Sequence, residues 1–117
     1  MKAEKFLNVF CSYLIVVCEK WKIRVSMRKA KSFNELVEYI SNEFPNVKIL
    51  NMIREKIKLL KSDPLKYARE KLGRDKYGNP MFSIEVTGDI RILYSVDSKN
   101  CIVFIWEVGP HKRVYEP

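Results

Sequence analysis

Apolar and polar positions in the first half of the chain predict one strand followed by two helices. Apolar residues alternate with polar ones over residues 21–27, which is typical of a strand with one buried face. Ser32 and Glu35 have the capping-box spacing that begins a helix, and apolar residues then recur at helical intervals until Pro45. A second helix is expected over residues 47–61, with isoleucines and leucines on one face and lysines opposite. Only a short turn joins the two helices, so they should form a helical hairpin.

The second half of the chain has a period of two, which predicts strands. They are expected over residues 82–86, 90–96 and 101–108. The last of these is apolar on both faces, as a central strand must be. One or two helical turns are expected over residues 65–72 and a loop over residues 76–80. The resulting order, β-α-α-β-β-β, is an α+β arrangement in which the last strand can return beside the first, with both helices on one sheet face.

An apolar run at residues 6–18, preceded by Lys2 and Lys5, superficially resembles a signal peptide. The run is too short to span a bilayer, which takes about 20 residues, and no small-residue cleavage site follows it. We therefore interpret it as a core or interface segment, either helix or strand, of a cytoplasmic protein without a membrane partner. Cys11 and Cys18 within the run are expected to be buried free thiols.

The composition fits one folded domain with a short extension. The chain has 117 residues, of which 47% are hydrophobic, and we assign residues 1–20 to the extension and residues 21–117 to the domain. Its net charge is +8, and basic side chains concentrate in residues 20–31 and 48–76, whereas acids cluster in residues 35–43. A single lysine is best interpreted as part of a solvated surface. The segregation of charge favours a nucleic acid or an acidic protein as partner.

Several site classes are disfavoured by the residues that the chain contains. Its three cysteines include no C-x-x-C pair, and His111 is its single histidine, which argues against a zinc site and against a secreted disulfide scaffold. The sequence has no glycine-rich phosphate loop, no G-x-S-x-G and no H-E-x-x-H motif. We therefore expect neither a metal nor a cofactor.

Candidate chemistry lies late in the chain. Arg91 sits within a predicted strand, opposite in parity to Ile90 and Ile92. Considered alone, it is a surface arginine or the ion-pair partner of Glu85 or Glu107. Further polar and cationic side chains follow the last strand, namely His111, Lys112, Arg113 and Tyr115. By themselves these residues are best interpreted as a solvated C-terminus.

Three segments resemble the RelE/ParE superfamily of toxins from type II toxin–antitoxin systems: GDIRILY at 88–94, IVFIWEVG at 102–109 and GPHKRVY at 109–115. The resemblance extends over residues 21–117. It implies a small, twisted, mainly antiparallel sheet with the helical hairpin packed on one face. It also implies an antitoxin, a short acidic protein that wraps around the toxin, and it leaves open a homodimer or a heterotetramer with that antitoxin.

The resemblance implies two classes of activity. RelE-like members enter the ribosomal A site and cut messenger RNA, whereas ParE-like members share the fold, bind gyrase and lack the cleavage residues. We expect the first activity, an endoribonuclease (mRNA interferase) that inhibits translation by directing the 2′-hydroxyl onto the neighbouring phosphate. A ParE-like gyrase inhibitor and a catalytically decayed binding protein remain the alternatives.

The family's functional residues map onto a few positions. Arg91 matches the strand arginine that holds the scissile phosphate, and Tyr115 matches the C-terminal tyrosine that orients or deprotonates the 2′-hydroxyl. His111 stands where many members have arginine, and Ser83 and Glu85 stand where some members have lysines. RNA-binding side chains are expected at Lys71, Arg74, Lys76, Lys112 and Arg113. Arginine suits the phosphate because its fork is always charged and bidentate, and histidine can act as acid or base.

Overall fold

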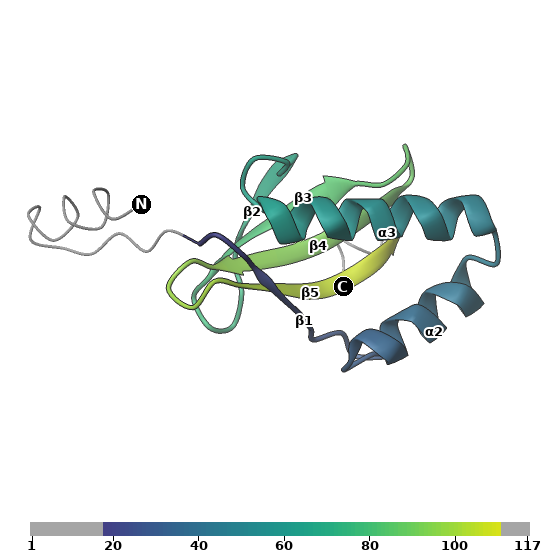
Figure 1. Cartoon of the computed structure of the whole chain (residues 1–117), viewed down its shortest axis with the longest axis horizontal. Coiled ribbons are helices and arrows are strands. Elements are labelled where there is room, and N and C mark those ends of the chain that lie inside the picture. Colours follow the sequence, from purple (N-terminus) through teal and green to yellow (C-terminus); the bar gives the residue numbers. More distant parts are fainter. Residues whose placement is uncertain (1–17, 111–117) are drawn as a thin grey trace, which may run out of the picture.

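The computed structural model describes residues 18–110, which form two helices and a five-stranded sheet (Figure 1). In chain order the elements are β1 (Lys22–Val25), α2 (Phe33–Glu43), α3 (Val47–Ser62), β2 (Glu70–Arg74), β3 (Pro80–Glu85), β4 (Ile90–Asp97) and β5 (Ile102–Pro110). The predicted α+β class, the first strand, both helices and the three late strands are confirmed.

Both helices begin at side-chain caps that the sequence contains. The Ser32 hydroxyl accepts a hydrogen bond from the backbone N–H of Glu35 at 3.2 Å. The Glu35 carboxylate accepts one from the N–H of Lys31 at 2.7 Å, so the predicted capping box is present, displaced by one residue at its return bond. Asn46 caps α3 by accepting a hydrogen bond from the N–H of Lys48 at 2.8 Å. Each cap satisfies N–H groups that have no partner inside the helix.

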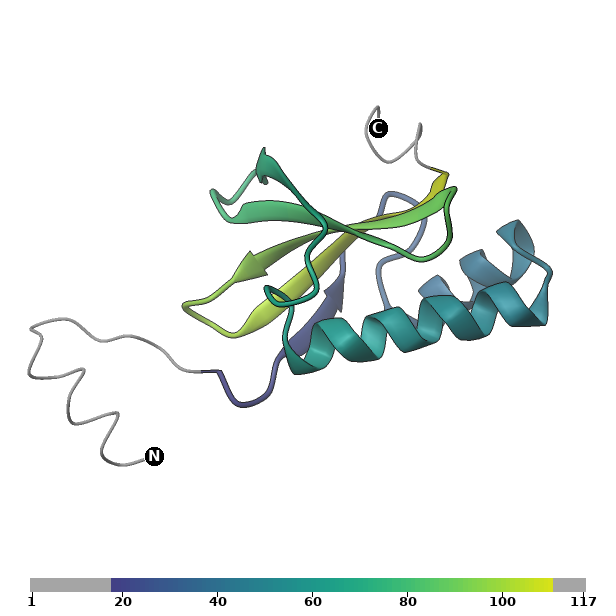
Figure 2. The same ribbon diagram turned by 90° about the horizontal axis from the view of Figure 1, so that it is seen from above.

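The strands lie side by side in the order β1-β5-β4-β3-β2. Strand β1 runs parallel to β5, and every other pair is antiparallel. The chain therefore returns to its first strand with its last, and β5 is flanked on both edges, as predicted from its apolar character on both faces. Figure 2 shows the twist of the sheet, with α3 crossing beneath it. This twist is the usual right-handed one of β-structure.

The prediction for residues 65–72 is wrong in part. Only a short turn follows α3, and the chain then forms the edge strand β2, which pairs with β3. The order is therefore β-α-α-β-β-β-β, one strand more than predicted. Strand β2 has the sequence EKLGR and is almost wholly exposed, so it lacks the alternation that marks a half-buried strand. Its partner, reached through a short hairpin loop, determines its conformation.

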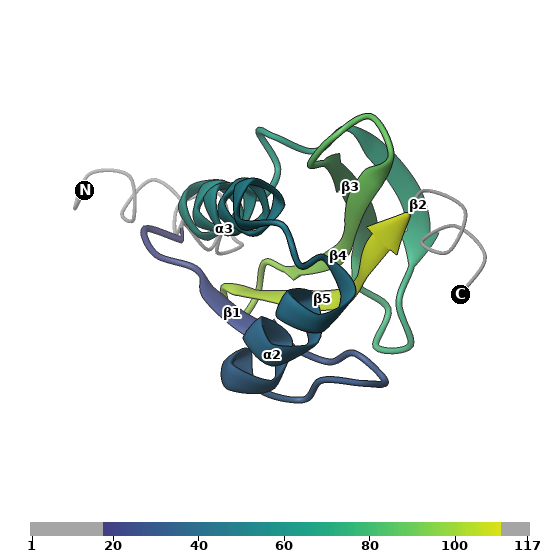
Figure 3. The same ribbon diagram turned by 90° about the vertical axis from the view of Figure 1, so that its right-hand side faces the viewer.

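The helices cover one face of the sheet and create the core there (Figure 3). Leu36 and Ile40 of α2 and Ile53, Ile57 and Leu60 of α3 are buried against the sheet. The strands contribute Val25, Ile84, Ile92, Tyr94, Val96, Val103, Ile105 and Val108. Strand residues that alternate with these positions point to the other side, which we call the open face because α2 and α3 do not cover it.

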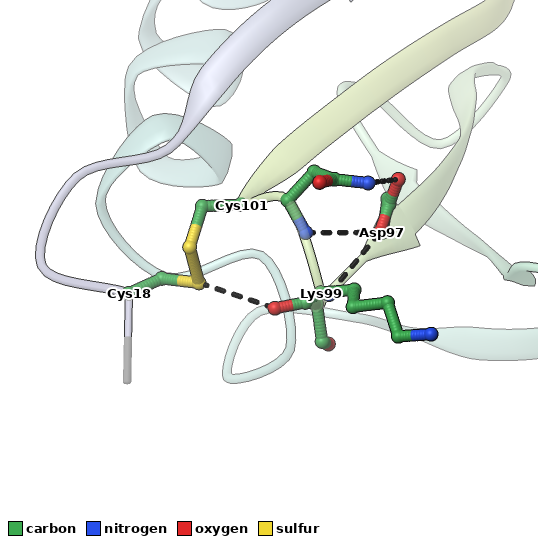
Figure 4. The surroundings of a disulfide bond; sticks show 6 residues. Cys18, Asp97, Lys99 and Cys101 are labelled. Carbon is green, nitrogen blue, oxygen red and sulfur yellow. Dashed lines mark hydrogen bonds between the residues drawn. A yellow bond between two sulfur atoms is a disulfide. The ribbon is translucent and has the colours of Figure 1, made fainter. Parts of the chain in front are cut away.

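One cysteine prediction is also wrong, because Cys18 is disulfide-bonded to Cys101 (Figure 4). The partners are 83 residues apart in sequence, with Cα atoms 5.6 Å apart. The parallel pairing of β1 with β5 brings them together, since the Lys22 N–H donates to the Cys101 carbonyl at 2.9 Å. Spacing alone does not reveal such a pair. Cys11 and the rest of the apolar run at 6–17 lie outside the described residues.

Neither α2 nor α3 has the length and apolar character that crossing a membrane would need, and no other helix occurs between residues 18 and 110.

Candidate functional site

Arg91 projects from β4 onto the open face, where the hairpin turn before that strand holds its side chain. Its Nη1 donates to the carbonyl oxygens of Thr87 at 2.9 Å and Gly88 at 3.3 Å. The turn is itself braced, because the Thr87 hydroxyl accepts hydrogen bonds from the N–H groups of Asp89 at 3.2 Å and Ile90 at 3.0 Å. The Arg91 side chain is only 13% exposed. It is therefore a positioned arginine and not a loose surface cation.

Glu85 is the acidic neighbour of Arg91 on the adjacent strand. Its Oε1 lies 3.9 Å from Arg91 Nη1 and 3.8 Å from Arg69 Nε. An ion pair with Glu85 is one of the interpretations that the residues alone suggested for Arg91. Within residues 18–110, all contacts of Arg91 with polar groups involve Nη1. Nε and Nη2 of the guanidinium thus have no partner among these residues and can take a second anion.

The C-terminal candidates follow the strand that pairs with Arg91. Gly109 is the register partner of Arg91, and Pro110 that of Ile90. His111 comes next in the sequence, but His111, Lys112, Arg113 and Tyr115 lie outside the described residues. Their convergence with Arg91 on one sheet face stays a prediction.

The candidate RNA-binding residues of the β2–β3 hairpin do not gather around Arg91. Lys71 and Arg74 lie on the edge strand β2, where they pair with Phe82 and Pro80. The Arg74 guanidinium closes the hairpin by donating to the Gly78 carbonyl at 2.7 Å. Lys76, in the hairpin loop, lies instead against two aromatic rings farther along the sheet.

That loop is tied to the sheet by Asp75, a residue that the sequence analysis did not single out. The Asp75 carboxylate accepts hydrogen bonds from the N–H groups of Tyr77 at 2.8 Å and Asn79 at 2.9 Å. It also accepts from the Ser95 hydroxyl at 2.6 Å, and Ser95 in turn accepts from Nε1 of Trp106 at 2.8 Å. Burial raises the pKa of Asp75, but the hydrogen bonds from Ser95, Asn79 and Tyr77 outweigh it and hold the pKa below its usual value.

The Asp75 network fixes a group of rings on the open face, which we call the aromatic cluster: Tyr77, Phe104 and Trp106. Their ring centroids are 5.7 to 6.2 Å apart in all three pairs. The Lys76 ammonium lies 5.3 Å from the Tyr77 centroid and 5.8 Å from that of Trp106, within the range of cation–π attraction. The parity of Phe104 in its strand indicates the open face, but only the tertiary structure adds the loop tyrosine.

Between residues 18 and 110, no three His, Cys, Asp or Glu side chains come together in a way that would hold a metal ion.

The sequence pattern and the fold agree with one family. The family model described as "ParE toxin of type II toxin-antitoxin system, parDE" matches residues 23–115, most of the chain. The chain belongs to this toxin family. It is thus a type II toxin of the RelE/ParE superfamily, as the three segments indicated. No curated protein sequence matches the chain.

Solved toxins share the fold at low sequence identity. The archaeal RelE–RelB complex from Pyrococcus horikoshii OT3 matches with 16% identity and a TM-score of 0.56, covering 80% of this chain and 97% of that one. The RelBE2 toxin–antitoxin complex from Mycobacterium tuberculosis matches with 22% identity and a TM-score of 0.52, covering 79% and 99%. The YoeB/ParE toxin from Agrobacterium tumefaciens matches with 14% identity and a TM-score of 0.54, covering 77% of this chain and 98% of that one. These likenesses support the fold of the toxin domain.

Proposed function

We propose that this toxin is a ribosome-dependent endoribonuclease that enters the A site and cuts messenger RNA, until an acidic antitoxin covers it. The observation that carries the proposal is how the Arg91 guanidinium is held. The turn carbonyls and Glu85 fix one nitrogen of its guanidinium, and two others lack a partner within residues 18–110. A preorganised fork of this kind suits a phosphate whose charge increases during the reaction.

The reaction requires little from the protein beyond position and charge. The substrate's own 2′-hydroxyl attacks the adjacent phosphorus, the 5′-oxygen leaves, and the products are a cyclic phosphate and a new 5′-hydroxyl end. Arg91 is assigned to the phosphate charge, Tyr115 to orienting the nucleophile, and His111 to proton transfer. His111 comes two residues after Gly109, the register partner of Arg91, and this closeness in sequence supports its assignment to the same site.

Primer extension on a message translated in a cell-free system tests the proposal. The full chain should produce new 5′ ends, and Arg91→Ala should reduce their rate of formation by about 100-fold or more, as for loss of one charge-stabilising donor. Arg69→Ala is the matched control, because Arg69 pairs with the same Glu85 oxygen but is 65% exposed. A message with a 2′-deoxyribose at the cut site should stay intact.

Folding failure is separable from loss of catalysis. Arg91→Lys retains a cation but not the fork, so it should fold and yet cut more slowly than the natural chain. Circular dichroism of each variant checks the fold. If the natural chain yields no new 5′ ends on a translated message, the proposal is wrong.

A second candidate function is gyrase inhibition, and Glu85 favours it. A carboxylate 3.9 Å from Arg91 partly neutralises the cation that would hold a phosphate, and Ser83 and Glu85 replace lysines that some RNA-cutting members carry. The matching family model is also described as a ParE toxin. A supercoiling assay discriminates, since only this function predicts inhibition of purified gyrase. A decayed binding protein would do neither, and its inhibition of growth would be insensitive to Arg91→Ala.

A further inference from the structure

We propose that the aromatic cluster, with Lys76, is a stacking site for bases of single-stranded RNA next to the phosphate that Arg91 holds. The inference rests on the proposed endoribonuclease function, which it extends by a separate substrate-binding surface. Tyr77 is 61% exposed, and Phe104 and Trp106 are half-buried on the same face. A contiguous group of rings at the surface is a feature of interaction sites.

The rings are held rigidly, which is what a stacking site requires. Trp106 is fixed at its Nε1 by Ser95, and Ser95 is fixed by Asp75. The same Asp75 carboxylate holds the backbone of Tyr77. Two rings from different parts of the chain therefore share one anchor, the Asp75 carboxylate, which reduces the conformational entropy lost when a base stacks on them.

The location of the cluster links it to the candidate cleavage site. Both lie on the open face, and Ser95, which contacts Trp106, is four residues along β4 from Arg91. At the rise of a strand that separation is about 13 Å, a span of a few nucleotides. An RNA strand crossing the sheet would meet the rings shortly before or after the phosphate on Arg91.

The charge around the rings is suited to a polyanion. Lys76 lies over two of the rings, and Arg24 of β1 is the register partner of Phe104. The carboxylates of Asp75 and Asp97 accept hydrogen bonds from nearby loop and turn groups. Rings beside cations are the usual composition of sites for single strands, where bases stack and phosphates pair with the cations.

The aromatic cluster is separate from the cavity that the described residues form beside α3. The described residues do form a cavity of about 350 Å³, but it lies between α3 and the β2–β3 side of the sheet. Its lining is Lys56, Leu59, Tyr67, Ala68, Arg69, Ile84, Glu85 and Val86. No ring of the aromatic cluster belongs to it. A partner helix needs a groove for its anchors, whereas a base needs only a ring face.

Tryptophan fluorescence of the full chain tests the inference. The probe is a single-stranded RNA octamer with 2′-O-methyl groups, which cannot be cut by 2′-hydroxyl attack, added at low ionic strength. We expect it to quench Trp106, and the response should vanish in Trp106→Phe, where only Trp21 of the core still emits. Inorganic polyphosphate of equal charge should bind without quenching, because it has no bases.

Three variants separate stacking from charge. Tyr77→Ala should weaken binding of the octamer by about 5- to 150-fold, the usual effect of losing one stacking ring, and Tyr77→Phe should bind like the natural chain. Lys76→Ala should weaken binding more than Lys66→Ala. The latter is a matched control, because Lys66 also lies over a tyrosine, at 5.4 Å from Tyr67, but outside the cluster.

Each outcome decides the question. Equal quenching by polyphosphate, or unchanged binding by Tyr77→Ala, would overturn the stacking site. Tighter binding of an acidic peptide such as oligoglutamate than of RNA would assign the surface to a protein partner and overturn it as well. Cleavage of a translated message that Tyr77→Ala leaves unaffected would refute the site while preserving the proposed function. Quenching that depends on Tyr77, without any cleavage of a translated message, would support the stacking site but refute the proposed function.

Discussion

The hydrogen bond between Tyr94 and Pro64 gives the sharpest test of what holds the fold together. Tyr94 has no exposed surface, and its hydroxyl donates to the Pro64 carbonyl at 2.6 Å, joining the middle of β4 to the turn after α3. Tyr94→Phe removes the donor and leaves a buried carbonyl unsatisfied, which costs about 1–3 kcal/mol in the free energy of unfolding. In a domain of this size that is a decrease of roughly 5–20 °C in Tm.

Urea denaturation followed by tryptophan fluorescence measures the loss, because Trp21 is part of the core. Tyr77→Phe is the matched control, since it deletes the same hydroxyl from an exposed loop residue and should change stability by less than about 0.5 kcal/mol. If the two variants unfold at the same urea concentration, the Tyr94 hydrogen bond contributes nothing and the reasoning is refuted.

The pH dependence of the free energy of unfolding gives an independent test of the Tyr94 contribution. Burial, and to a smaller extent the negative charge of Asp63, raises the pKa of Tyr94 well above that of an exposed tyrosine. The unfolded chain loses this proton near about pH 10, whereas the folded chain retains it. The contribution of Tyr94 is therefore complete below that pH and declines as pH rises further. The stability gap between the natural chain and Tyr94→Phe should narrow above pH 10, and a constant gap would contradict the assignment.

Three further predictions concern the open face and the disulfide. Asp75→Asn should lower Tm at neutral pH. Because hydrogen bonds hold the pKa of Asp75 down, this loss of Tm should shrink as pH falls below about 4. Thermal melts that show the same loss at every pH would contradict the prediction. Glu85→Gln should tighten binding of single-stranded RNA about 2- to 5-fold, because it removes the negative charge beside Arg91. Glu55→Gln on α3 changes the net charge equally and should have no such effect in the same titration. Cys101→Ser should lower the free energy of unfolding by about 2–4 kcal/mol, because the disulfide spans 83 residues of sequence. The natural chain in reductant should be destabilised by the same amount. Urea denaturation of the natural chain that does not change in reductant would count against the bond.

The parts of the fold that were predicted correctly are those with local signals. Ser32 and Glu35 identify the start of α2 because a cap is made by neighbours in sequence. The late strands alternate because one face packs on the helices. Strand β2 and the Cys18–Cys101 bond have no comparable local signal, since each is determined by a partner brought close by tertiary structure.

The residues of the candidate site likewise include some that local sequence signals predicted and some that they did not. The position of Arg91 on the open face follows from strand parity, and its pairing with Glu85 from the hairpin register. The aromatic cluster was missed because Tyr77 belongs to a loop, and a loop residue has no periodicity that indicates its direction. Asp75 reads as an ordinary turn residue in the sequence, and only the contact with Ser95 reveals that it organises the surface.

The bond between Cys18 and Cys101 makes most of the folded domain a closed covalent ring. Both helices and strands β1 to β4 lie within it, whereas β5 follows it in the sequence. A single proteolytic cut between residues 18 and 101 opens the ring but leaves the two pieces attached to one another. An unfoldase that pulls from the C-terminus can translocate β5 as a single chain. Beyond Cys101 it must translocate two chain segments at once. Pulling from that end thus removes β5 before it meets the closed ring.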